Sequence, residues 1–284
     1  MSRKHVQISV KGSNPFLSFV FIKKKFSFEY FSGSFSIFNE KILKKLLLIK
    51  IKKVFVTFSP KRDFYSSIKN SIILSKIGFS VITHISYSTN SRIFFRYCLL
   101  LKTNKIDGLF LLKGDKKKIS KNSITKILIA RAFFKNIYSA IYPDFHKKTI
   151  NFSFEKKRIK KKKSVGVSKF VTQVTMDLFS LSDIKENFSI EKENVYIGVF
   201  VFRKIKEIFF FYKICKIKLP FFFIKNFTLF FKKKKNFFYE VNFTFLKILR
   251  FIGFKRFHLY SINIKEVLDF TIFLKNEKNW LNRV

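Results

Sequence analysis

Residues 54–85 read VFVTFSPKRDFYSSIKNSIILSKIGFSVITHI, and this stretch passes from a strand pattern to a helix pattern and back. Val54 to Phe58 and Phe79 to Ile85 are short β-rich runs. Between them, Asp63 can cap a helix that ends before Gly78, a residue common after a helix C-terminus. One face of that helix would carry four isoleucines at helical spacing, Ile68, Ile72, Ile73 and Ile77. The stretch therefore predicts a strand, a helix and a second strand.

The residues before this stretch alternate between apolar and polar side chains. Phe26, Phe28 and Tyr30 alternate with Ser27 and Glu29, and a similar pattern runs through residues 6–22. We expect two or three antiparallel strands here, joined by hairpin turns at 12–15 and 23–25. Residues 39–50 have helical spacing and begin with a capping residue, asparagine. The predicted fold of this part is α/β, a compact mixed sheet with two helices.

The remaining sequence predicts a basic, Phe-rich α+β extension. Short strands are expected at 99–102 and 109–112, a helix at 119–142 and another helix at 264–274. Residues 156–163 hold a run of Lys and Arg that reads as a basic linker. The predicted units are therefore a first domain at 1–97, a mixed extension at 98–155, the linker at 156–164 and a C-terminal extension at 165–284.

The charge is extreme for a chain of this kind. There are 59 Lys and Arg against 17 Asp and Glu, a net charge of +42, in a chain that is 48% hydrophobic and holds 43 Phe. An A+T-rich gene would raise the Lys and Phe content, but it explains the shortage of acids less readily. A compact chain with this charge repels itself, whereas binding a polyanion releases counterions. The composition therefore favours a nucleic-acid partner over a free-standing enzyme.

Motifs for chemistry are largely missing from the sequence. Cys98 and Cys215 are too far apart for a metal-ligand spacing, and the four His have no Cys or carboxylate at zinc spacing. Asp107 and Asp115 are the one candidate carboxylate pair, and both also suit turns. No apolar run reaches the length of a membrane span. We therefore expect no catalysis, no metal, no cofactor, no small-molecule substrate and no transmembrane insertion.

Residues 6–97 resemble small-subunit ribosomal protein eleven in the order and spacing of their motifs. That family opens with a strand, an Asn-rich turn, a strand pair and a Gly, followed later by a strand, a basic turn, a helix ending in Leu-x-x-x-Gly-Phe and a strand. The matching positions are Ile8, Asn14, Phe16, Leu17, Ser18, Phe19 and Gly33, then 54–56, Lys61, Arg62, Asp63, 74–79 and 81–90. The family's Gly-rich turn is replaced by residues 57–60, and its basic C-terminal tail is replaced by residues 92–96.

The resemblance implies a structural protein of the mitochondrial small ribosomal subunit, bound to rRNA on the platform beside other mitochondrial ribosomal proteins. It would work in the mitochondrial matrix and be encoded in the organelle. Three alternatives stay open: another ribosomal protein such as one similar to large-subunit protein eighteen, an intron-encoded maturase or nuclease, and a peripheral subunit of a respiratory complex.

The residues expected to meet RNA are exposed cations and polar residues in turns, which would position the protein on phosphates. They are Lys11, Asn14, Lys23, Lys24, Lys25, Lys61, Arg62, Lys69, Thr89, Asn90, Arg92, Arg96, Lys156, Lys157, Arg158, Lys160, Lys161, Lys162 and Lys163.

Overall fold

The structure is a computed structural model of the 284-residue chain. It describes residues 26–31, 37–57, 64–87, 89–112, 123–143, 152–182, 184, 188, 190–215, 225 and 235–281. The strands predicted within 6–22 and the turns at 12–15 and 23–25 lie outside these ranges.

Eight strands form one closed barrel. Each strand pairs in parallel with the next along the chain, and the last pairs in parallel with the first. The strands are β1 (Phe26–Phe31), β2 (Lys53–Thr57), β3 (Ser80–Ser86), β4 (Gly108–Leu112), β5 (Asn136–Ile141), β6 (Lys169–Thr172), β7 (Val195–Phe200) and β8 (Phe257–Tyr260).

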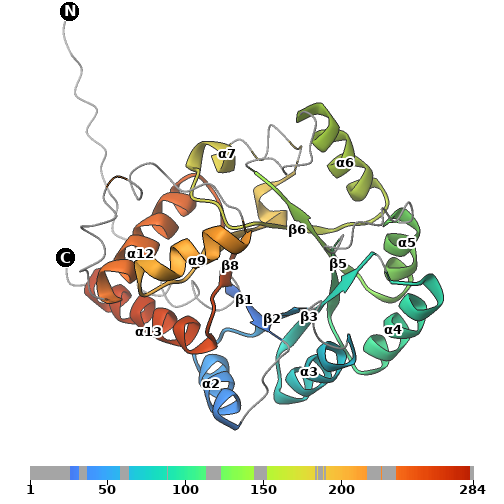
Figure 1. Ribbon diagram of the computed structural model, residues 1–284, viewed down its shortest axis with the longest axis horizontal. Coiled ribbons are helices and arrows are strands. Elements are labelled where there is room, and N and C mark those ends of the chain that lie inside the picture. The colour runs from blue at the N-terminus through green and yellow to red at the C-terminus, as the bar shows by residue number, and fades with distance from the viewer. Residues whose placement is uncertain are drawn as a thin grey trace, which may run out of the picture.

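Helices connect the strands and surround them (Figure 1). They are α2 (Ile37–Leu48), α3 (Phe64–Ile77), α4 (Ser91–Thr103), α5 (Ser123–Phe133), α6 (Phe152–Ser164), α7 (Leu178–Ser182), the 3₁₀ helix η1 (Lys192–Asn194), α9 (Ile205–Cys215), α12 (Lys235–Phe251) and α13 (Ile264–Leu281). Parallel strands joined by outer helices and closed on themselves make a TIM barrel. None of the described helices is both long enough and apolar enough to cross a membrane.

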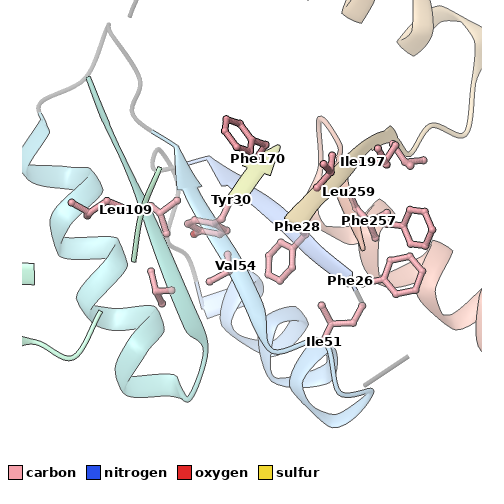
Figure 2. Packing of buried hydrophobic residues seen from close by; sticks show 14 of the residues in the cluster. Phe26, Phe28, Tyr30, Ile51, Val54, Leu109, Phe170, Ile197, Phe257 and Leu259 are labelled. Carbon is pink, nitrogen blue, oxygen red and sulfur yellow. The ribbon is translucent and has the colours of Figure 1, made fainter. Parts of the chain in front are cut away.

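The outward-facing and inward-facing side chains of the strands have different neighbours. Phe26, Phe28 and Tyr30 of β1 face outward and belong to the large core between the strands and the helices (Figure 2). Phe26 meets Phe257 of β8 there, with ring centroids 5.6 Å apart, across the seam that closes the barrel. The alternate side chains fill the barrel interior, where Phe55 of β2 is the central ring of a second cluster. Both faces are buried, as is usual for parallel strands.

Five helices end in the same way before the strand that follows. In α3 the residue after the helix, Gly78, has φ +109° and donates to Ser75 O, and Phe79 N–H donates to Leu74 O. This pair of bonds is the Schellman motif, which uses the left-handed residue to reverse the chain. Equivalent pairs of bonds close α2, α4, α6 and α12, and an apolar residue follows each left-handed residue: Ile51, Ile106, Val167 and Phe254. Each of these residues is buried and fixes the start of the next strand.

The predicted compact mixed sheet with two helices and an α+β extension is wrong. The sheet is a closed barrel of parallel strands, and residues beyond 97 supply β4 to β8. Residues 99–102, predicted as a strand, lie in α4, and the helix predicted at 119–142 divides into α5 and β5. The predicted linker lies in α6, whose Ile159 is buried. The predictions failed because β1 carries Ser27 and Glu29 between its apolar residues, so this barrel strand shows the same alternation as a half-exposed strand in a hairpin.

Candidate active site at the C-terminal mouth of the barrel

Four polar side chains lie inside the barrel and form what we call the interior polar cluster: Ser27, Glu29, His84 and His258. Ser27 and Glu29 alternate with the outward-facing residues of β1, so the strand geometry points them inward. Ser27 Oγ lies 2.9 Å from His258 Nδ1, and Glu29 Oε1 lies 4.0 Å from His84 Nδ1. Three strands, β1, β3 and β8, thus bring together residues up to 231 positions apart.

Burial keeps Glu29 and His84 uncharged near neutral pH. Loss of solvent raises the pKa of the Glu29 carboxyl to about 8 and lowers the pKa of the His84 imidazole to about 3. Burial is also the main cause that lowers the pKa of His258 well below its ordinary value, and the electrostatic interaction with His84 is the second. At 4.0 Å, Glu29 and His84 are therefore a neutral acid beside a neutral base rather than an ion pair.

The two imidazoles each keep one nitrogen without a hydrogen-bond partner. Nε2 of His84 and Nε2 of His258 are buried and have no partner among the described residues. Ser27 Oγ also lies 3.4 Å from Phe257 O, to which it can donate. When Ser27 donates to Phe257 O, His258 Nδ1 is the donor to Ser27 and Nε2 is a lone-pair acceptor. Buried polar atoms without partners are costly, so these two nitrogens mark a place where a polar group fits.

Aromatic rings pack against the interior polar cluster from the middle of the barrel. Phe55 packs edge-on against His258 at 4.5 Å and against His84 at 6.0 Å between ring centroids. It also contacts Phe110 and Tyr138, and Tyr138 contacts Tyr196. These rings fill the middle of the barrel and pack against the interior polar cluster there. Glu29 is the most accessible member, with 12% of its side chain exposed against 4% for His84.

A group of three rings stands at the carboxyl ends of β7 and β8, and we call it the aromatic wall: Phe200, Phe211 and Tyr260. Phe200 stacks on Phe211 of α9 at 4.0 Å, and Phe211 lies 6.3 Å from Tyr260. Tyr260 also packs against His258 at 4.6 Å, and its hydroxyl donates to Thr172 O. Gly198 makes room for this ring, since a Cβ there would lie 2.7 Å from Tyr260 Cε2.

An ion-pair network fixes the chain segments that follow β7 and β8. Arg203, just after β7, pairs with Glu266 of α13 at 2.9 Å and with Glu207 of α9 at 3.4 Å. Glu266 is almost fully buried and also accepts from Ser261 Oγ. Removing one partner from such a buried pair is strongly destabilising. The network therefore holds the aromatic wall in place beside the mouth.

The interior polar cluster places a carboxyl beside an imidazole, two kinds of group that take part in general acid–base chemistry. In TIM barrels the catalytic side chains come from the carboxyl ends of the strands; Tyr260 is the last residue of β8, and Glu29 is the fourth of the six residues of β1. A neutral carboxyl can donate a proton that an ordinary glutamate has already lost. Within the described ranges, no three His, Cys, Asp or Glu side chains come close enough to hold a metal ion.

The residues predicted to contact RNA are spread over the outside of the molecule. Lys69 is exposed on α3, and Asn90 caps α4 through a bond from Arg92 N–H to its Oδ1. Arg92 and Arg96 line an open pocket of about 460 Å³ with Ser91 and Phe95. Exposed on α6 are Lys156, Lys157, Lys160, Lys161 and Lys163.

The other predicted contacts have structural partners or fall outside the described ranges. Arg158 pairs with the buried Glu155, and Lys162 donates to Ala140 O. Burial and the nearby Arg158 lower the pKa of Lys162 to about 7. Thr89 is half-buried at the end of β3. Outside the described residues are Lys11, Asn14, Lys23, Lys24, Lys25, Lys61, Arg62 and Asp115 of the candidate carboxylate pair. Its partner, Asp107, is exposed before β4, at the opposite end of the barrel from the mouth.

Sequence reasoning missed the interior polar cluster because it placed Ser27 and Glu29 in antiparallel strands joined by hairpin turns rather than in a barrel strand. One signal was present. Glu29 is the one acid in a strand whose neighbours are Phe28 and Tyr30, within a chain that has few acids. An isolated acid at such a position is a candidate functional group once the strand is known to be buried on both faces.

Solved structures share this fold. A TIM-barrel protein from Clostridium thermocellum, described as an uncharacterized protein that binds two copies of 5-methyl-5,6,7,8-tetrahydrofolic acid, matches with TM-score 0.64 and 13% identity, over 93% of this chain and 98% of that one. The tryptophan synthase alpha-subunit of Pyrococcus furiosus matches with TM-score 0.54 and 11% identity, over 93% and 100%. A comparison with protein-family models and with curated protein sequences found no match.

These findings overturn the ribosomal assignment. The resemblance of residues 6–97 to ribosomal protein eleven is wrong, because that segment is part of a barrel whose structural neighbours are not ribosomal proteins. The platform role, the rRNA and ribosomal-protein partners, and the exclusion of a small-molecule partner are withdrawn with it. The expectation of no catalysis conflicts with a fold that enzymes and ligand-binding proteins share. The mitochondrial matrix stays a prediction.

Proposed function

We propose that this chain is an enzyme that binds a small organic molecule at the C-terminal mouth of its barrel, with Glu29 as the proton donor. The single observation that carries the proposal is the Glu29 carboxyl itself. It is buried beside His84, its pKa is raised to about 8 by burial, and part of it is exposed toward the mouth. A general acid works best when its pKa lies near the working pH.

The aromatic residues near the interior polar cluster favour a flat heteroaromatic ligand. Phe211 and Tyr260 of the aromatic wall are half-buried, and stacking on aromatic rings contributes to binding whatever the substituents of the ligand. A neutral carboxyl has a donor and an acceptor side by side, which suits the edge of an amide-containing ring. A reduced folate has such a pterin ring and is the first candidate. The barrel from Clostridium thermocellum, which is described as binding a reduced folate, supports this choice.

Calorimetric titration of the full chain with 5-methyltetrahydrofolate tests the proposal. We expect saturable binding that Glu29→Gln and Tyr260→Ala each weaken by about tenfold, or about 1.4 kcal/mol. Glu40→Gln is the matched control, since Glu40 pairs with Lys44 on the surface of α2 and should bind as the unmodified chain does. Absence of binding would rule out the folate, and binding that survives both mouth variants would place any ligand elsewhere.

The proton-donor role has its own test. A ¹³C-NMR titration of the glutamate carboxyls should show one signal that titrates near pH 8 and disappears in Glu29→Gln. If every glutamate titrates below pH 6, Glu29 is ionised at neutral pH and cannot be the acid. The ligand titration and the carboxyl titration thus judge the binding and the chemistry separately.

A further inference from the structure

Three cations meet at the other end of the barrel, where the strands begin, and we call them the basal cations: Lys53, Lys169 and Arg256. Lys53 and Lys169 are the first residues of β2 and β6, and Arg256 directly precedes β8. They surround two phenol rings, Tyr138 and Tyr196. Lys53 Nζ donates to both phenol oxygens, at 3.2 Å to Tyr138 and 3.1 Å to Tyr196.

The ring contacts show how close the charges lie. Lys53 Nζ is 5.8 Å and Lys169 Nζ is 5.5 Å from the centre of the Tyr138 ring. Lys53 Nζ and the Arg256 guanidinium carbon are each 5.5 Å from the centre of the Tyr196 ring. The three cations thus converge on the same two rings, and like charges in partly buried positions repel by an amount that water screens only in part.

The surrounding residues do not balance this charge. Asp107 is the one acid of the described chain whose charge is felt at Tyr138 and Lys169, and its side chain is exposed. Burial and then the charge of Lys53 lower the pKa of Lys169. Burial alone would raise the pKa of the Tyr196 phenol, but Lys53, Arg256 and Lys169 outweigh it, so this pKa lies below its ordinary value. The phenol thus reports a local positive potential.

Lys53 and Lys169 also have N–H groups that their hydrogen bonds to these neighbours leave for another acceptor. Lys169 Nζ donates to Asn136 Oδ1 at 2.8 Å, which uses one of its three N–H groups. Lys53 uses two N–H groups on the phenols, and Arg256 contacts the Tyr196 ring by its face. All three side chains are half-buried, so solvent reaches them. A guanidinium and two ammonium groups gathered at the starts of three strands are donors of the kind that bind the oxygens of a phosphate group.

We propose that the N-terminal end of the barrel is a second binding site, which takes a phosphate group between Lys53, Lys169 and Arg256. The site lies at the opposite end of the barrel from Glu29 and does not depend on the function proposed for the mouth. An occupying anion would relieve the repulsion among the basal cations and tie together the starts of β2, β6 and β8. The phosphate can be free or can be the terminal group of a phosphorylated metabolite.

The experiment is a titration of the full chain with inorganic phosphate, and in a parallel arm with glycerol phosphate, against sodium chloride of matched ionic strength. Two signals are followed: the thermal midpoint, and the phenolate absorbance at alkaline pH. Phosphate should raise the midpoint and should raise the pKa of one tyrosine, an effect absent in Tyr196→Phe. Stronger binding of glycerol phosphate would indicate a phosphorylated metabolite as the occupant, and equal or stronger binding of inorganic phosphate would indicate the free ion.

Variants separate a built site from general attraction to a basic protein. Arg256→Met should weaken phosphate binding about tenfold, and Arg256→Lys should restore part of it. Lys69→Met, which removes one exposed charge from α3, is the control and should change nothing. An equal response to sodium chloride, or equal weakening by Lys69→Met, overturns the proposal and leaves the basal cations as a structural cap. Glu29→Gln should keep the phosphate response, so failure of one site is distinguishable from failure of the other.

Discussion

Glu29 is held by the fold in its neutral form, and this has a consequence for stability. Its pKa is about 8 in the folded chain and 4.5 when solvated, so folding favours the protonated group. The corresponding stability is complete below pH 4.5 and is lost as the pH rises through 8. At pH 7 the loss is on the order of 2–3 kcal/mol, because each pKa unit is worth about 1.4 kcal/mol and some solvent reaches the side chain.

Glu29→Gln should therefore stabilise the chain at high pH and not at low pH. The amide keeps the size of the neutral carboxyl and cannot ionise, so urea unfolding at pH 7 should give a larger unfolding free energy than for the unmodified chain, by about 2–3 kcal/mol. At pH 4.5 the two chains should unfold alike. Glu40→Gln, on the surface, provides the comparison and should show no such rise. A difference of equal size at both pH values would mean that ionisation of Glu29 plays no part.

The helix endings allow a test at the scale of single elements. α4 ends at Thr103, and Lys105 has φ +57°, a left-handed conformation that glycine adopts without strain. Lys105→Gly should raise the unfolding free energy by about 0.5–1 kcal/mol. Lys102→Gly, the same change three residues earlier and inside the helix, should lower it by about 1 kcal/mol. Denaturant unfolding of the two variants checks the opposite signs. Equal signs would show that the turn after α4 is not built as described.

Several elements could be predicted from the sequence because their local signals are complete. The strand, helix and strand of residues 54–85 appear as β2, α3 and β3, with Gly78 at the helix end as expected. The Lys-rich part of α6 was wrongly predicted as a linker. The helix is held by tertiary contacts, such as those of the buried Glu155 and Ile159, rather than by its composition. The break between α5 and β5 falls at Phe134 and Lys135, where no Gly or Pro marks it.

The whole-molecule arrangement could not be predicted in this way, because it depends on one long-range pairing. β1 and β8 meet over a separation of 231 residues between Ser27 and His258, and only this closure turns the polar face of β1 inward. The interior polar cluster is a consequence of closure, so no local pattern reveals it. The acids give a partial hint: of the few in the chain, Glu155 and Glu266 are buried and Glu29 is nearly so. Glu155, Glu266 and Glu29 thus hold defined places in the fold of a chain with net charge +42.

Closure also predicts that residues 1–97 cannot fold alone, although the sequence suggested a domain there. This fragment contains β1, β2 and β3, but β1 lacks its partner β8 and β3 lacks its partner β4. Phe55 would lose the rings of Phe110, Tyr138 and His258, which belong to later strands. The exposed apolar faces and two unpaired edges leave too little burial to offset chain entropy.

The purified fragment should therefore give a poorly dispersed ¹⁵N-NMR spectrum and no cooperative melting, whereas the full chain melts cooperatively. Adding the complementary fragment 98–284 should restore both signals, because it supplies β4 to β8. A well-dispersed spectrum from residues 1–97 alone would show that the barrel is assembled from an independent unit.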